Sequence, residues 1–116
     1  MSTIMVASAK GGVGKSTLCV GLGRILAEKG HKTLLVDMDI GVRSLDLLLN
    51  VAEKTVYNWG DVILGNCDPS KALIGITSNL ALLPAPLSLS EEYTGESVKK
   101  LIECYKEKFE YIILDA

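Results

Sequence analysis

Cysteine is scarce in this sequence, and the cysteines are too far apart in the chain to suggest a common disulfide or metal site. Cys19, Cys67 and Cys104 are odd in number and far apart, with no Cys-x-x-Cys pair and no neighbouring histidine. A disulfide framework and a zinc site are therefore both unexpected. Reduced thiols in a cytosolic protein are the simpler interpretation.

The features of secretion, membrane insertion and nucleic acid binding are also missing. No apolar run reaches the roughly 18–20 residues of a transmembrane helix, and residues 1–9 lack the basic start of a signal peptide. The net charge of −2 gives no basic field over the chain as a whole. We therefore expect a cytoplasmic protein that does not bind nucleic acid.

What remains is the composition of one small folded domain. The 116 residues are 48% apolar and 22% charged, so the chain can bury a core. Short apolar runs predict buried strands at Thr3–Ser8, Thr33–Asp37, Leu80–Leu83 and Tyr111–Asp115. Helical periodicity predicts helices at Ser16–Lys29, Thr55–Leu64 and Ser97–Phe109. This alternation predicts an α/β fold with a parallel sheet covered by helices on both faces.

All three predicted helices carry further signals. The first has an apolar face of Leu18, Leu22, Ile25 and Leu26, and Gly21 and Gly23 suggest close packing on the sheet. In the last, Thr94 is placed to cap the helix start. Tyr57 and Trp59, in the middle helix, are expected to pack in the core or an interface.

The strongest motif is a glycine-rich loop between the first strand and the first helix. It reads Lys10-Gly11-Gly12-Val13-Gly14-Lys15-Ser16-Thr17. Glycines let successive backbone N–H groups point inward at a polyphosphate, and the helix start adds further donors. Lys15 supplies a positive charge and the Ser16 hydroxyl can reach Mg²⁺, so the loop predicts MgATP binding. Ala9 replaces the first glycine of the usual pattern.

Two carboxylates follow the second predicted strand, in the sequence Asp37-Met38-Asp39. The carboxyl ends of parallel strands point to the ligand crevice, so both should lie on the side of the phosphate loop. Residues two apart in an extended segment face the same way. Either carboxylate can hold Mg²⁺ or orient a water molecule for attack on the γ-phosphate.

These motifs together resemble the MinD/ParA family of deviant Walker A ATPases. KGGVGKST is similar to the family's phosphate loop, in which the lysine matching Lys10 reaches the partner's nucleotide across a dimer interface. DMDIGVRSLDLLL and TVYNWGDVILGNC resemble the switch I region and the helix after it. There Asp39 matches the catalytic aspartate, and Asp37 matches the aspartate near the metal. YIILDA resembles the Walker B strand, and Asp115 matches the residue that reaches Mg²⁺ through water.

The resemblance implies a P-loop NTPase of the SIMIBI type that takes part in placing the division site. It implies catalytic roles for Lys10, Lys15 and Asp39. It also implies a magnesium site built from Ser16, Asp37, Asp39 and Asp115. The expected cofactors are ATP and Mg²⁺, and the expected partners are a second copy in an ATP-dependent homodimer and regulators similar to MinC and MinE.

The family continues past the Walker B strand, so we expect residues 1–116 to be the N-terminal portion of a longer ATPase domain. The absent part would include a C-terminal amphipathic helix, the one route by which the protein would lie at the inner face of the cell membrane.

Two other functions fit the same motifs. The first is a related ATPase with another cargo, in ParA-like DNA segregation, flagellar-number control or metal-cluster delivery. The second, from another class, is a nucleotide-binding fragment or interaction module that does not hydrolyse ATP.

Overall fold

The computed structural model describes residues 2–6, 13–42 and 44–116. Five strands lie in these ranges: β1 (Ser2–Val6), β2 (Thr33–Asp37), β3 (Ile74–Thr77), β4 (Leu80–Leu83) and β5 (Tyr111–Asp115). The α-helices are α1 (Val13–Glu28), α2 (Ser44–Leu48), α3 (Trp59–Ile63) and α4 (Gly95–Glu103). Two short 3-10 turns, Ala52–Lys54 and Pro69–Ala72, complete the list. No helix in the described ranges is long and apolar enough to span a bilayer.

The strands form one sheet in the order β1-β5-β2-β4-β3. All neighbours run parallel except β3, which pairs antiparallel with β4. The predicted α/β fold is confirmed, and the hairpin strand β3 is an addition to it. Asp37 and Asp115 are register partners at the carboxyl ends of β2 and β5, so the parallel arrangement alone brings two carboxylates together.

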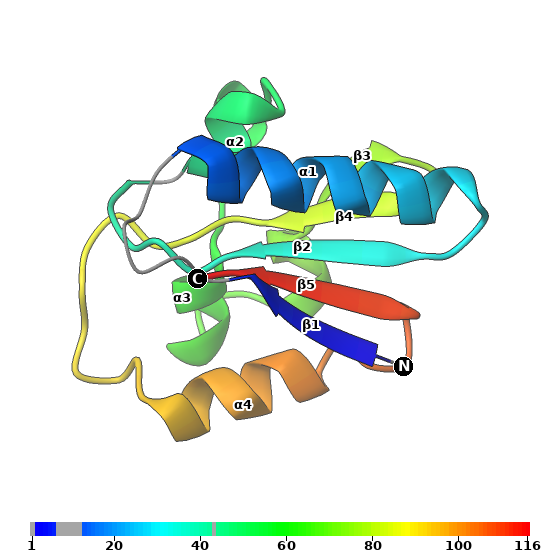
Figure 1. The fold of residues 1–116 in the computed structure, drawn as a ribbon. Coiled ribbons are helices and arrows are strands. Elements are labelled where there is room, and N and C mark those ends of the chain that lie inside the picture. The colour runs from blue at the N-terminus through cyan, green and yellow to red at the C-terminus, as the bar shows by residue number, and fades with distance from the viewer. Residues whose placement is uncertain (1, 7–12, 43) are drawn as a thin grey trace.

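Helices cover both faces of the sheet, with α1 and α2 on one side and α3 and α4 on the other (Figure 1). Leu35, Leu82 and Ile113 pack in the core under α1, while Leu34 and Ile112 pack under α3 and α4. Successive residues of a buried strand point to opposite faces, so each strand supplies both cores. This explains why β2 and β5 read as continuous apolar runs.

The predicted apolar face of the first helix is half right. Leu22 and Leu26 pack against the core, whereas Leu18 and Ile25 are 60% and 53% exposed. The fully buried side of α1 is formed by small residues such as Cys19 and Ala27. A Cβ on Gly23 would lie 2.8 Å from Leu35 Cδ2, whereas one on Gly21 would meet nothing within 4 Å. Close packing on the sheet is therefore confirmed for Gly23 and wrong for Gly21.

Helix boundaries also differ from the predicted ones. The middle helix begins at Trp59 rather than Thr55, because the Asn58 side chain accepts a hydrogen bond from the Asp61 amide and caps the helix there. The last helix ends at Glu103 rather than Phe109, and turns follow it. Its predicted cap is confirmed, since the Thr94 hydroxyl accepts a hydrogen bond from the Ser97 amide.

Candidate functional site

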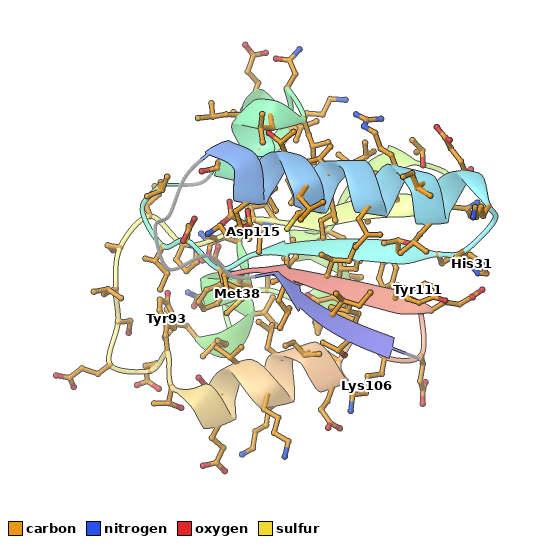
Figure 2. The ribbon with its side chains drawn as sticks, viewed as in Figure 1. His31, Met38, Tyr93, Lys106, Tyr111 and Asp115 are labelled. Atoms are coloured by element: carbon orange, nitrogen blue, oxygen red, sulfur yellow. The ribbon has the colours of Figure 1, made fainter. Side chains whose placement is uncertain are left out.

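Three chain segments converge at the carboxyl end of the sheet. They are the first turn of α1, the end of β2 with the residues after it, and the end of β5. Figure 2 shows Met38 and Asp115 at this end of the sheet and His31 and Tyr111 at the other. The Met38 amide donates to the Asp115 carbonyl at 3.0 Å, which keeps the two chain segments together beyond their last paired residues.

Lys15 lies at the centre of this cluster. Its Nζ donates to Asp39 Oδ2 and to the main-chain oxygen of Ala116, both at 3.0 Å, and lies 3.3 Å from Asp115 Oδ1. Its side chain is only 5% exposed. Burial on its own lowers the pKa of Lys15, but the hydrogen bond to Asp39 and the charge of Asp115 outweigh it. The pKa therefore lies above the ordinary value of 10.5.

Asp115 is fully buried at the end of β5. Its Oδ2 accepts a 2.8 Å hydrogen bond from the Ser16 hydroxyl. Its Oδ1 accepts no hydrogen bond from the residues that the structure describes, although the Lys15 ammonium is near enough for an ion pair. A buried carboxylate oxygen without a donor is costly, so a further ligand at this atom would be favourable.

Asp37 is 1% exposed, and both its side chain and its main-chain carbonyl accept hydrogen bonds. Its Oδ1 accepts from the Asp39 amide at 2.9 Å, and its Oδ2 accepts from the Leu45 amide at 3.2 Å. Its main-chain carbonyl accepts from the Trp59 indole at 2.8 Å. Burial raises the pKa of Asp37 to about 6, despite the two amide bonds that oppose the shift. Asp37 therefore organises the loop after β2 as well as adding charge.

The three aspartates together match the donor set of a hard divalent cation. Asp37, Asp39 and Asp115 each offer a carboxylate oxygen, and these atoms lie within 4.8 Å of one another. Magnesium prefers oxygen ligands of this kind. The open Oδ1 of Asp115 is the atom that most needs such a partner, so the residues present fit a magnesium ion.

Part of the predicted phosphate loop cannot be placed. Lys10, Gly11 and Gly12 lie outside the described residues, as do Ala9 and Arg43. Val13 begins α1, and Gly14 and Thr17 are exposed on its first turn. The structure brings Lys15 and Ser16 to the three aspartates, and it leaves the remaining loop residues as predictions.

Two contacts at this site were not foreseen from the sequence. Trp59 was expected only to pack, and its burial at 1% exposure confirms that, but its indole also bonds the end of β2. The Gly41 amide donates to the Pro86 carbonyl, so the segment after β4 holds the loop after β2. Both contacts join parts of the chain that no local motif connects.

The opposite end of the sheet carries a separate set of polar groups. His31 Nδ1 lies 2.7 Å from Glu110 Oε2, and its ring packs edge-on against Tyr111 (Figure 2). A hollow of about 500 Å³ near Lys32 and Phe109 also lies at this end. Among the predicted site residues that the structure describes, none lines this hollow.

The chain is similar in sequence to known proteins. Residues 4–111 match a family model described as the CobQ/CobB/MinD/ParA nucleotide binding domain. The septum site-determining protein MinD of Synechocystis sp. is 44% identical over 115 residues, which cover 97% of this chain and 43% of that protein.

Solved structures of two kinds share the fold. MinD in the MinC:MinD cell division protein complex of Aquifex aeolicus matches with a TM-score of 0.85 and 37% identity, covering 99% of this chain and 47% of that one. Cobyrinic acid a,c-diamide synthase of Mycobacterium smegmatis, with a bound ATP analog and magnesium, matches with a TM-score of 0.83 and 29% identity, covering 98% and 50%. The chain thus spans half the length of these proteins or less.

Proposed function

The chain belongs to the CobQ/CobB/MinD/ParA family of nucleotide-binding domains, and from this premise we propose that it binds MgATP as part of a division-site ATPase of the MinD type. Residues 1–116 would form the N-terminal portion of that ATPase domain. The observation that carries the proposal is the cluster of Lys15, Ser16 and three aspartates at the carboxyl end of the sheet.

The phosphates would lie at the start of α1. Backbone N–H groups of Lys10–Thr17 and the positive end of the helix favour an anion there. The Lys15 ammonium has three N–H donors and uses two of them to bond Asp39 and the Ala116 oxygen. The third N–H would bond a phosphate oxygen, and the opposite charges of the two groups would make that bond strong.

Ser16, Asp39 and Asp115 are the residues that would hold magnesium, with Asp37 behind them. Magnesium, when bound, would neutralise phosphate charge. Ser16 and Asp115 are already bonded to each other, which limits the reorganisation that binding requires. Asp39 is the most exposed of the three aspartates, so it is the one placed to orient a water molecule toward the γ-phosphate.

Other parts of the proposal depend on the resemblance. Lys10 would reach the nucleotide of a second copy in an ATP-dependent homodimer. Regulators similar to MinC and MinE would act on that dimer, and a C-terminal helix beyond this chain would attach it to the inner face of the membrane. The MinC:MinD complex of A. aeolicus supports the first kind of regulator.

A second candidate is a family ATPase with another task. The likeness to cobyrinic acid a,c-diamide synthase shows that this fold also serves other chemistry. Identity favours the MinD type, at 37% for the MinC:MinD structure of A. aeolicus against 29% for the synthase. A non-hydrolysing fragment remains the alternative from another class, and steady ATP hydrolysis by the purified chain would contradict it.

Isothermal calorimetry with MgATP tests the proposal. We expect measurable binding by the 116-residue chain and an affinity at least about tenfold lower in Lys15→Ala, since a bond to a charged group contributes roughly 1.5–3 kcal/mol. Lys29→Ala, at an exposed lysine after the same helix, is the matched control and should bind as wild type does. Absence of binding heat in the folded wild type, or equal affinity in Lys15→Ala, would contradict the proposal.

A further inference from the structure

Trp59 is the only tryptophan of the chain, and it bridges two strand ends. It is the first residue of α3 and is 1% exposed. Its backbone N–H donates to the Pro84 carbonyl at 3.0 Å, and its indole Nε1 donates to the Asp37 carbonyl at 2.8 Å. Tyr93 packs edge-on against the indole, with ring centroids 5.1 Å apart.

The sheet explains why a donor is needed at this point. The pairing of β2 with β4 ends at Val36 and Leu83. The Asp37 carbonyl lies one residue beyond this last pair, and so beyond the hydrogen-bond ladder between the two strands. The Trp59 indole donates to it there, and the buried carbonyl is satisfied.

Asp37 in turn holds the loop that carries Asp39. Its two carboxylate oxygens accept hydrogen bonds from the Asp39 and Leu45 amides. Asp39 then reaches Lys15 at 3.0 Å. A chain of hydrogen bonds thus runs from the indole through Asp37 to the acidic residue at the site.

We propose that Trp59 is a positioning residue of the nucleotide site: its indole N–H fixes the Asp37 backbone and, through the Asp37 carboxylate, the place of Asp39. A phenylalanine would fill much of the same apolar volume but would leave the Asp37 carbonyl unpaired. The role of the indole is therefore separable from core packing. The proposal rests on the proposed function only in calling this cluster a nucleotide site.

Amide hydrogen exchange on Trp59→Phe tests the positioning directly and needs no nucleotide. We expect the Asp39 and Leu45 amides to exchange about tenfold faster, the effect of one lost hydrogen bond. Amides in α4 should keep their wild-type rates. Tyr57→Phe, two residues away and on an exposed ring, is the control and should change neither set.

Two results would overturn the proposal. One is unchanged exchange at Asp39 and Leu45 in Trp59→Phe. The other is equal acceleration of these amides and those of α4, which would make Trp59 a packing residue only.

A measurement on the wild-type chain keeps the test open if Trp59→Phe does not fold. The chain has a single indole N–H, so one resonance reports on it. We expect this proton to exchange slowly without ligand and its resonance to move when MgADP is added. Fast indole exchange would refute the hydrogen bond, and a resonance unmoved at saturating MgADP would refute the link to the site. If calorimetry detects no nucleotide binding at all, the proposed function fails, while the exchange data still decide whether the indole holds the loop.

Discussion

Replacing Lys15 with methionine should destabilise the folded protein, because it leaves buried carboxylates without a cation. Lys15 is 5% exposed, and its partner Asp115 is fully buried. Methionine has a similar length and helix propensity, so the substitution removes mainly the charge. The change isolates the ion pair at the centre of the site.

The structure sets the size of the effect. Removing one partner of a buried pair costs about 3–5 kcal/mol. The contact to Asp39 adds little, because that carboxylate is 34% exposed and a surface pair contributes less than about 1 kcal/mol. We expect a loss of about 3 kcal/mol at neutral pH, the lower end, since Ser16 still donates to Asp115.

Urea unfolding measures this loss. With a slope of roughly 1–3 kcal/mol per molar urea, the midpoint should fall by about 1–3 M. Lys29→Met, at an exposed position, is the control and should unfold within about 0.5 kcal/mol of wild type.

The pH dependence has a defined sign. The pKa of Lys15 is raised above 10.5 in the folded protein, so its contribution is complete below pH 10.5 and is lost as the pH rises through the folded value. The difference between wild type and Lys15→Met should therefore shrink in strong alkali. A variant as stable as wild type at pH 7, or a difference that stays constant from pH 7 into strong alkali, would refute the reasoning.

Two further predictions concern the helix α1 and the residue Asp37. Gly21→Ala should stabilise the chain by about 1 kcal/mol through helix propensity. Gly23→Ala should be about 1–3 kcal/mol worse than Gly21→Ala, because its Cβ would press on buried Leu35; equal thermal unfolding of the two variants would contradict this. The folded pKa of Asp37 is about 6, against an ordinary 3.8, so the folded state holds this proton more tightly than the unfolded state does. Without metal, wild type should lose about 3 kcal/mol relative to Asp37→Asn as the pH rises from about 3 to 7, and a flat difference in unfolding free energy over that range would show that the shift is absent.

The sequence was sufficient for the fold and for the meeting of the acidic residues. Asp37 and Asp115 each end an apolar run, and parallel strands bring such ends to one edge of the sheet. Lys15 and Ser16 were predicted by the glycine-rich loop before them. At these positions the local sequence motif and the strand order of the sheet place the residues at the same site. The sequence alone was therefore enough to predict them.

Other features depend on contacts that no local pattern records. The helix α1 contacts the sheet partly through small residues such as Cys19 and Ala27. Helical periodicity of large apolar side chains therefore wrongly included Leu18 and Ile25, which face solvent. The strand β3 is four residues long and pairs with β4 across a short turn, too brief for a clear periodicity. The Trp59 contact joins residues 22 positions apart and exists only after both strands and α3 have packed.

The central place of β5 has a consequence for biosynthesis. This strand lies between β1 and β2, although it is made almost 80 residues after β2. Until residues 111–115 leave the ribosome, the first two strands have no common neighbour, and their apolar edges stay open to other chains. A nascent chain that stalls earlier would therefore be exposed to aggregation, and the cluster of three aspartates would assemble only when Asp115 emerges.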